Sequence, residues 1–151
     1  MRPVRAGGRA LLASAAMRIG RALLDEIVAH AREEAPNECC GMLAGGDGTA
    51  TRIYRARNAE ASPFRYTIHP QDQIRIMTEI EERGEEVAAI YHSHTRTAPY
   101  PSQTDINFAA NWPGVEWIIV GLASGEPPQV RSYLIDGAEV REVAVQEATA
   151  P

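Results

Sequence analysis

The stretch "EVAAIYHSH", residues 86–94, decides the architecture of this chain of 151 residues. Its apolar residues follow one another almost without interruption, which is typical of a central strand covered on both faces. Successive side chains of a strand point to opposite faces, so His92 and His94 project to the same side while Ser93 points away. The stretch therefore predicts a buried strand that ends in two imidazoles on one face.

Periodic apolar residues on both sides of this strand predict alternating helices and strands. We expect helices over three segments: 20–34, 70–83 and 102–111. We expect further strands over 38–46, 51–57, 64–70, 115–123 and the two arms of 129–145, which Asp136 and Gly137 join as a hairpin turn. The sum is an α/β fold, a mixed β-sheet with flanking helices.

Two of these segments also predict which side chains are buried. The segment 64–70 has the alternation of a half-buried strand, and the helix over 70–83 has an apolar face at helical spacing. The alternating residues are Phe64, Tyr66 and Ile68. The residues expected on the helix face are Ile74, Met77 and Ile80.

A single domain over residues 17–147 is expected, because 44% hydrophobic residues in a chain of this length form a core of ordinary size. Residues 1–16 are predicted to be a flexible extension and residues 148–151 a tail. The first 16 residues could instead be a secretory signal, because three arginines precede a short apolar segment, or result from a start codon upstream of a true start at Met17.

Composition argues against several classes of partner. The net charge of −5, with scattered basic residues, provides no surface for nucleic acid. No apolar run approaches the roughly 18 residues that cross a bilayer, so we expect a soluble protein. Cys39 and Cys40 are adjacent and cannot form a secreted disulfide framework, so they are predicted to be small core residues of a cytoplasmic protein.

His92 and His94 can converge on one metal ion, because they lie on one face about one pleat repeat apart. Asp105 follows at the start of a predicted helix, and the segment between is long enough to fold back over the strand end. Two neutral histidines and one carboxylate around Zn²⁺ leave one tetrahedral position for water, whose pKa such a site can lower to about 7. The pattern indicates metal-assisted hydrolysis.

Each part of this pattern also has a structural interpretation. Ser102 and Asp105 in "SQTD" form a variant of the helix capping box, and a His-x-His pair on a strand is by itself a weak indication of a metal. Of the other two histidines, His30 is predicted to be a surface or half-buried helical residue. His69 is predicted to cap the following helix or to lie on the surface.

The parts together resemble a known signature. The spacing His-x-His-x7-Ser-x2-Asp, which residues 92–105 have without departure, is similar to that of the JAMM (MPN+) zinc metalloprotease family. Within it the chain resembles the bacterial Mec-like branch of CysO-cysteine peptidases, through "HAREEAPNECCGMLAG" (30–45) and "YHSHTRTAPYPSQTD" (91–105). The resemblance implies a single JAMM/MPN domain with a cytidine-deaminase-like α-β-α arrangement.

The resemblance also implies a role for each site residue. His92, His94 and Asp105 would bind one Zn²⁺. Glu38 would take a proton from the attacking water and deliver one to the departing amine. Ser102 would donate a hydrogen bond to the oxyanion that develops on the carbonyl.

The resemblance implies a ubiquitin-fold sulfur-carrier protein as partner, with its Gly-Gly-type C-terminal tail bound extended beside an edge strand at 58–70. The leading hypothesis is release of cysteine from a carrier–cysteine adduct, a step of cysteine biosynthesis. Two alternatives use the same site: trimming of a carrier precursor and a deubiquitinase-like isopeptidase activity. A non-catalytic MPN scaffold is an alternative of another class, and a homodimer is left open.

Overall fold

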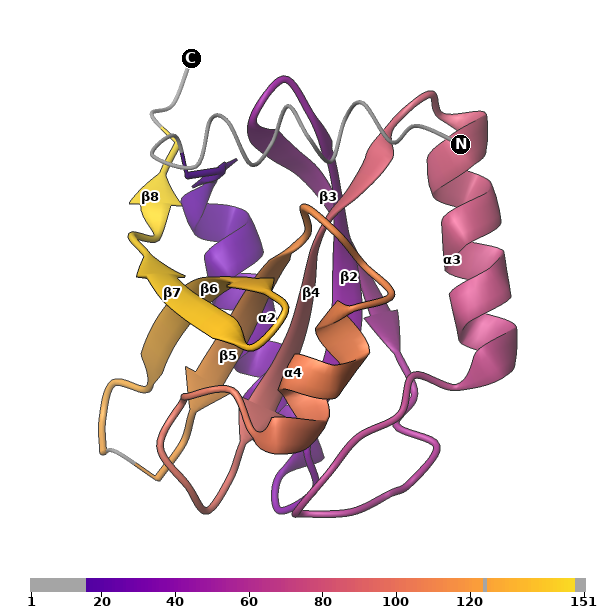
Figure 1. The fold of residues 1–151 in the computed structure, drawn as a ribbon. Coiled ribbons are helices and arrows are strands. Elements are labelled where there is room, and N and C mark those ends of the chain that lie inside the picture. Colours follow the sequence, from indigo (N-terminus) through magenta and orange to yellow (C-terminus); the bar gives the residue numbers. More distant parts are fainter. Residues whose placement is uncertain (1–15, 124, 149–151) are drawn as a thin grey trace.

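The computed structural model describes residues 16–123 and 125–148, which form one eight-stranded sheet and three helices (Figure 1). The strands are β1 (Arg18–Ile19), β2 (Cys40–Gly46), β3 (Thr49–Ala56), β4 (Glu86–His94), β5 (Glu116–Gly121), β6 (Gln129–Asp136), β7 (Glu139–Val143) and β8 (Gln146–Glu147). The helices are α2 (Arg21–Glu34), α3 (Pro70–Glu82) and α4 (Gln103–Ala109). The strand order is β7-β6-β5-β4-β2-β3-β1-β8, with parallel and antiparallel pairs. The predicted α/β fold with a mixed sheet is confirmed.

Strand β4 lies inside the sheet, as its apolar sequence predicts. It pairs antiparallel with β2 and parallel with β5, and the register places His92 between Cys40 and Ile119. Its last six residues are buried. The two histidines are therefore held by strands on both sides, which fixes their backbone.

Two buried clusters lie on opposite faces of the sheet. Leu24, Ile27 and Ala31 of α2 pack over one face, and Ile76 and Ile80 of α3 pack with Ala109 of α4 over the other. Cys39 belongs to the cluster under α2 and Cys40 to the cluster under α3 and α4, and both thiols are free. The prediction that the two cysteines are small core residues is confirmed.

The predicted hairpin near the end of the chain is also confirmed. Strands β6 and β7 pair in antiparallel register, with Asp136 opposite Glu139. Gly137 lies between them at a φ of 62°, a left-handed conformation that glycine adopts without steric cost. The Asp-Gly pair therefore marks the turn for a conformational reason.

The strand expected over 64–70 is wrong, because residues 57–69 form a loop with one isolated bridge in the described part of the chain. The side chain of Asn58 takes the place of a strand partner. Its amide nitrogen donates to the carbonyl of Arg65 at 3.1 Å, and its oxygen accepts from the amide of Thr67 at 3.1 Å. Hydrogen bonds to a side chain thus compete with a sheet ladder here.

The alternation in this loop still predicts part of its burial. Tyr66 and Ile68 are buried and join the cluster under α3 and α4. Phe64, which the same pattern places on the buried side, is 69% exposed. Without a neighbouring strand, the period of two does not extend to the start of the segment.

The buried face of α3 differs from the expected one. Asp72, Ile76 and Ile80 face inward. They recur every fourth residue, so they share one face of the helix. Asp72 can be buried because its carboxylate accepts hydrogen bonds from the backbone amide and the guanidinium of Arg57 at 2.8 to 3.0 Å. The residues turned outward instead are Ile74, 68% exposed, and Met77, 38% exposed.

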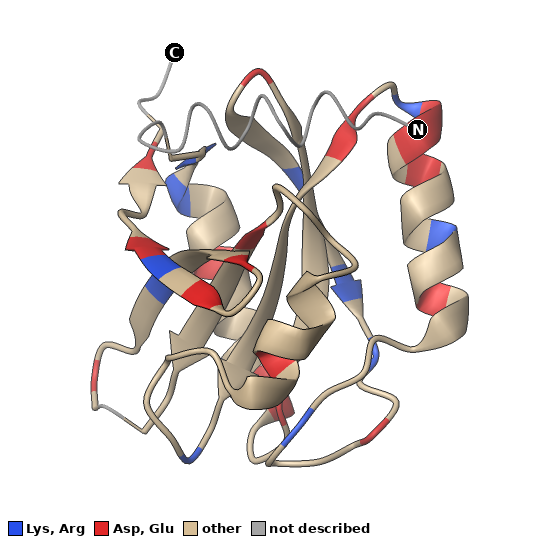
Figure 2. Cartoon of the chain, viewed as in Figure 1, with Lys and Arg blue, Asp and Glu red and all other residues tan. Residues whose placement is uncertain are grey.

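Charged residues of both signs are scattered over the molecule, and no helix or strand presents a continuous basic face in the described residues (Figure 2). Within those residues no helix has the length and apolar character that a bilayer span requires. The predicted extension 1–16 and tail 148–151 lie outside the described residues, apart from Ala16 and Ala148.

Candidate metal centre

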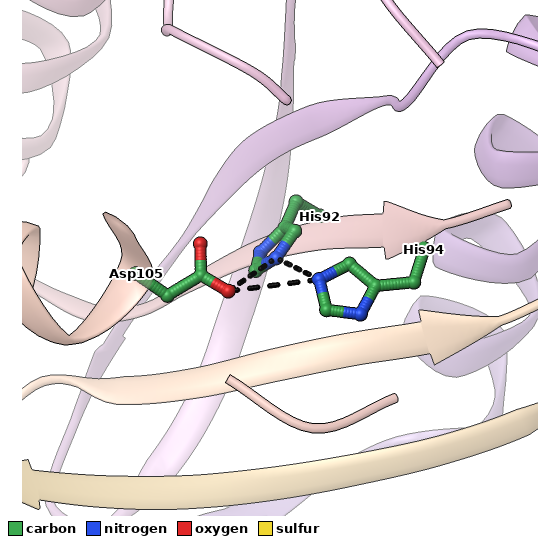
Figure 3. A group of neighbouring side chains, drawn as sticks. All are labelled: His92, His94 and Asp105. Atoms are coloured by element: carbon green, nitrogen blue, oxygen red, sulfur yellow. Dashed lines mark hydrogen bonds and ion pairs between the residues drawn. The ribbon is translucent and has the colours of Figure 1, made fainter. Parts of the chain in front are cut away.

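The end of β4 and the first turn of α4 bring three side chains together (Figure 3). Nε2 of His92 lies 3.1 Å from Nε2 of His94 and 3.2 Å from Oδ2 of Asp105. The distance from Nε2 of His94 to Oδ2 of Asp105 is 3.6 Å. All three residues are buried, so two imidazole nitrogens and one carboxylate oxygen face one another in a small space.

These distances fit Zn²⁺. Tetrahedral bonds of about 2.0 to 2.1 Å place neighbouring ligand atoms roughly 3.3 Å apart, and the observed separations run from 3.1 to 3.6 Å. Three protein ligands leave the fourth position for water or substrate, which is typical of catalytic rather than structural zinc sites. The donor set therefore suits the cofactor predicted from the sequence.

A capping box holds Asp105 in place. Oγ of Ser102 accepts a hydrogen bond from the Asp105 amide at 3.1 Å, and Oδ2 of Asp105 accepts one from the Ser102 amide at 2.9 Å. The capping interpretation of this motif is therefore confirmed, and the same Asp105 faces the two histidines. The preceding loop is fixed to β6, because the hydroxyl of Tyr133 donates to the carbonyl of Pro99 at 2.5 Å.

The two imidazoles are oriented in different ways. Nδ1 of His94 lies 2.8 Å from the carbonyl of Ala98, which leaves Nε2 for a metal. Nδ1 of His92 is buried without a hydrogen-bond partner among the described residues, and its ring stacks on Tyr66 at a centroid distance of 4.4 Å. Sequence reasoning missed both Ala98 and Tyr66 as supports of the site; only the burial of Tyr66 had a signal, the alternation at 64–68.

The charges at this centre suit a cation. Burial alone raises the pKa of the Asp105 carboxyl, but the adjacent His92 and His94 and the hydrogen bond from the Ser102 amide hold it below its usual value. Burial lowers the pKa of His92, whereas at His94 the effect of burial is outweighed by Asp105 and the Ala98 carbonyl, which raise its pKa. An ionised carboxylate beside a neutral imidazole is the protonation state that a divalent metal requires of its ligands.

Glu38 lies two residues before the start of β2 and is only 5% exposed. Its amide donates to the carbonyl of Ser62 at 2.9 Å. Burial raises the pKa of its carboxyl, His94 acts to lower it and Asp105 acts to raise it, and the net result is a pKa of about 7. A carboxyl with this pKa exchanges protons readily near neutral pH, which is the property of a general acid-base group.

Ser93 connects Glu38 to the two histidines. It lies between them on β4 with its side chain on the other face, as predicted, and it is fully buried. Its Oγ accepts a hydrogen bond from the Cys39 amide at 2.8 Å. The residue after Glu38 is therefore held by the residue between His92 and His94, which limits relative movement of the two parts of the site.

The other two histidines have structural surroundings. His69 is the N-cap of α3, and its Nδ1 accepts from the Gln71 amide, so the capping prediction is confirmed. His30 is more buried than expected, at 4% exposure, with its Nδ1 2.7 Å from the hydroxyl of Tyr91. Its burial lowers its pKa to about 4.

Metal-dependent hydrolases combine a metal site open at one position with an acid-base carboxylate beside it, and comparisons with known proteins agree with this class. The model of a family described as prokaryotic homologs of the JAB domain matches residues 20–136. The chain is 37% identical over 123 residues to the CysO-cysteine peptidase of Mycobacterium tuberculosis, an alignment that covers 80% of this chain and 84% of the relative. The chain belongs to the family of prokaryotic JAB-domain homologs.

Further relatives support the same class. A desampylase of Haloferax volcanii is 34% identical over 128 residues, which cover 80% of this chain and 88% of that protein. The solution structure of a protein from Desulfitobacterium hafniense has a TM-score of 0.75 at 30% identity and covers 87% of this chain and 94% of its own. The predicted JAMM-type resemblance is confirmed, and the protein is a metallopeptidase-type hydrolase.

Proposed function

We propose that the protein hydrolyses the amide at the C-terminus of a ubiquitin-fold sulfur-carrier protein and releases cysteine from a carrier–cysteine adduct. His92, His94 and Asp105 bind Zn²⁺, Glu38 transfers the proton, and Ser102 stabilises the oxyanion. The observation that carries this proposal is a buried carboxyl with a pKa of about 7 beside a three-ligand site, in a chain 37% identical to a CysO-cysteine peptidase.

The chain's own residues divide the reaction between them. When bound, Zn²⁺ supplies a Lewis acid that polarises the carbonyl and lowers the pKa of water to about 7. Glu38 takes a proton from the attacking water and delivers it to the departing nitrogen, so the amine leaves in neutral form. Its pKa of about 7 suits both transfers.

Ser102 can serve the oxyanion while it caps α4. Its Oγ accepts from the Asp105 amide, which leaves the hydroxyl hydrogen available for donation. The side chain is exposed, in contrast to the three metal ligands, so it can reach a substrate. An oxyanion donor of this kind contributes about 10²- to 10³-fold to the rate.

The substrate class is supported by the relatives and by a groove beside the site. Related proteins are described as a CysO-cysteine peptidase, a desampylase and a probable TtuB-protein conjugate cleaving protease. Tyr66, which stacks on His92, also lines a groove of about 450 Å³. Its aromatic and apolar lining includes Met77, Phe108, Trp112 and Trp117. The expectation that the carrier's C-terminal tail pairs with an edge strand at 58–70 is wrong, because that segment is a loop.

Two carrier substrates test the proposal. The zinc-loaded protein is incubated with a ubiquitin-fold carrier ending in Gly-Gly-Cys and with a precursor that has a longer C-terminal extension, and the products are weighed by mass spectrometry. We expect loss of one cysteine from the first substrate, and the same loss slowed by about 10²- to 10⁴-fold with a Glu38→Gln variant. Cleavage of the precursor alone would favour the trimming alternative, which uses the same site.

A third substrate separates the alternatives that the relatives suggest. One relative is described as a probable TtuB-protein conjugate cleaving protease, so a carrier joined to a lysine side chain represents this activity. Preference for that conjugate over the cysteine adduct would make the protein an isopeptidase. Purified protein that binds no stoichiometric zinc and cleaves none of the three substrates would favour the non-catalytic scaffold.

A further inference from the structure

The position of Glu38 determines where the leaving group lies, and this inference rests on the proposed function. Because Glu38 protonates the departing nitrogen, that nitrogen must come within hydrogen-bonding distance of its carboxyl. In an amino acid the α-carboxylate carbon lies roughly 2.5 Å from the nitrogen, two bonds away. A group that recognises a leaving amino acid must therefore border Glu38.

Three segments that border Glu38 are tied together by hydrogen bonds. The Glu38 amide donates to the carbonyl of Ser62. The hydroxyl of Thr95, the residue after His94, lies 3.1 Å from the carbonyls of both Pro36 and Pro63. The loop beyond β4 is thus fixed against the segments that contain Pro36 and Pro63.

Arg96 lies on this fixed rim, one residue after Thr95. In Figure 2 the loop between β4 and α4 contains blue and no red, because Arg96 is its only charged residue. The guanidinium carbon lies 5.3 Å from the ring centre of Phe64. Among the residues that the structure describes, Arg96 has no ion pair with a carboxylate.

The stacking of Arg96 on Phe64 matters for recognition. An aromatic face restrains the plane of a guanidinium and leaves its N–H edge directed outward. That edge matches a carboxylate with two parallel hydrogen bonds. Phe64 is itself 69% exposed, so the pair stands open at the rim and is accessible to a substrate.

We propose that Arg96, supported by Phe64, binds the α-carboxylate of the leaving amino acid and makes the site selective for a single C-terminal residue. A lysine in a protein conjugate offers no such group, because four methylenes separate its nitrogen from the backbone and its own carboxyl is in a peptide bond. Arg96 thus distinguishes release of an amino acid from cleavage of an isopeptide.

Matched substrates test this assignment. A ubiquitin-fold carrier ending in Gly-Gly is ligated to cysteine or to cysteinamide, which differ only in the carboxylate. We expect wild-type kcat/KM to favour the acid by about 10- to 100-fold, the usual range for a hydrogen bond to a charged group. Arg96→Ala abolishes this preference by slowing cleavage of the acid alone, and Arg96→Lys retains part of it.

Binding measured by calorimetry gives a readout independent of turnover. With Glu38→Gln as the background, the acid carrier binds more tightly than the amide carrier, and Arg96→Ala removes the difference. Arg141→Ala is the matched control, since Arg141 is an exposed arginine on the edge strand β7. It leaves the acid-to-amide ratio unchanged.

The outcomes separate this inference from the proposed function. Equal cleavage of acid and amide by the wild type overturns the role of Arg96 and leaves the hydrolase function intact. An equal loss on both substrates in Arg96→Ala also overturns it, because Arg96 then contacts the body of the carrier. If the zinc-loaded wild type cleaves neither carrier, the proposed function fails and this inference fails with it.

Discussion

Glu38 and Glu116 are both buried carboxyls, yet the structure treats them differently. Glu116 is 1% exposed, and its two oxygens accept hydrogen bonds from the Ser132 hydroxyl at 2.7 Å and the Met17 amide at 2.8 Å. Glu38 is 5% exposed, and its carboxylate has no hydrogen bond to any described residue. Burial alone therefore does not distinguish the two carboxyls; the lack of hydrogen-bond partners beside a candidate metal site is what makes Glu38 the candidate for catalysis.

The difference between the two glutamates separates stability from chemistry. Glu116 holds the segment before β1 against β5 and β6, which a hydrogen-bonded buried carboxylate does well. Glu38 has no such hydrogen bonds, so burial raises the pKa of its carboxyl. Substitutions of Glu38 or of the three candidate ligands should therefore affect activity. Substitutions of Glu116 or of its hydrogen-bond donors should affect stability.

The largest effect is expected for Asp105→Ala, which removes the one carboxylate among the three proposed zinc ligands. Two imidazoles remain, and we expect the purified variant to lose stoichiometric zinc and measurable hydrolysis. Metal content by elemental analysis checks this. Asp72→Ala is the control, because Asp72 is also a buried carboxylate in the first turn of a helix. Zinc retained in Asp105→Ala would contradict the assignment of the ligands.

A residue of this site could be predicted from the sequence where its position follows a periodic pattern or a capping motif, and not where it depends on contacts between distant segments. His92 and His94 were predictable because the period of a strand fixes their common face, and Asp105 because its capping box fixes the start of α4. Tyr66 was not predictable as the partner of His92, since stacking across a loop leaves no periodic signal. The side chains of Asn58 and Asp72 replaced expected backbone or apolar contacts, which patterns of hydrophobicity do not reveal.

Glu38→Gln tests the catalytic side of the comparison directly. Glutamine keeps the shape but cannot transfer the proton, so kcat should fall by about 10²- to 10⁴-fold. Zinc content should be unchanged, because Glu38 is not among the three ligands. Single-turnover cleavage of the carrier–cysteine adduct measures the loss. Full activity of this variant would return Glu38 to the same structural class as Glu116.

Ser102→Ala should have a smaller effect, about 10²- to 10³-fold on kcat with little change in KM, because an oxyanion donor acts in the transition state. The loss of its capping interaction also lowers stability by about 1 kcal/mol. Ser102→Asp retains a capping oxygen but has no hydroxyl hydrogen to donate, so it should restore stability and not activity. Recovery of activity in Ser102→Asp would assign Ser102 to capping alone.

The pH dependence of stability should reveal Glu38 in the metal-free protein. A carboxyl whose folded-state pKa is raised to about 7 stabilises the fold below its unfolded value and loses this contribution as pH rises through 7. Wild type should therefore lose roughly 3 kcal/mol relative to Glu38→Gln between pH 4 and pH 8, measured by urea unfolding. The pKa of Asp72 is lowered by its hydrogen bond from Arg57, so its contribution is lost only at more acidic pH. The Asp72→Asn difference should stay constant over the same range.

The smallest effect concerns the other glutamate. Ser132→Ala removes one hydrogen-bond donor from the fully buried carboxylate of Glu116 and should lower the free energy of unfolding by about 1 to 3 kcal/mol. Hydrolysis measured well below the melting temperature should not change, because β6 is separated from β4 by β5. If activity falls with stability unchanged, the carboxyl of Glu116 is coupled to the metal centre through β5, and the division between the two glutamates does not hold.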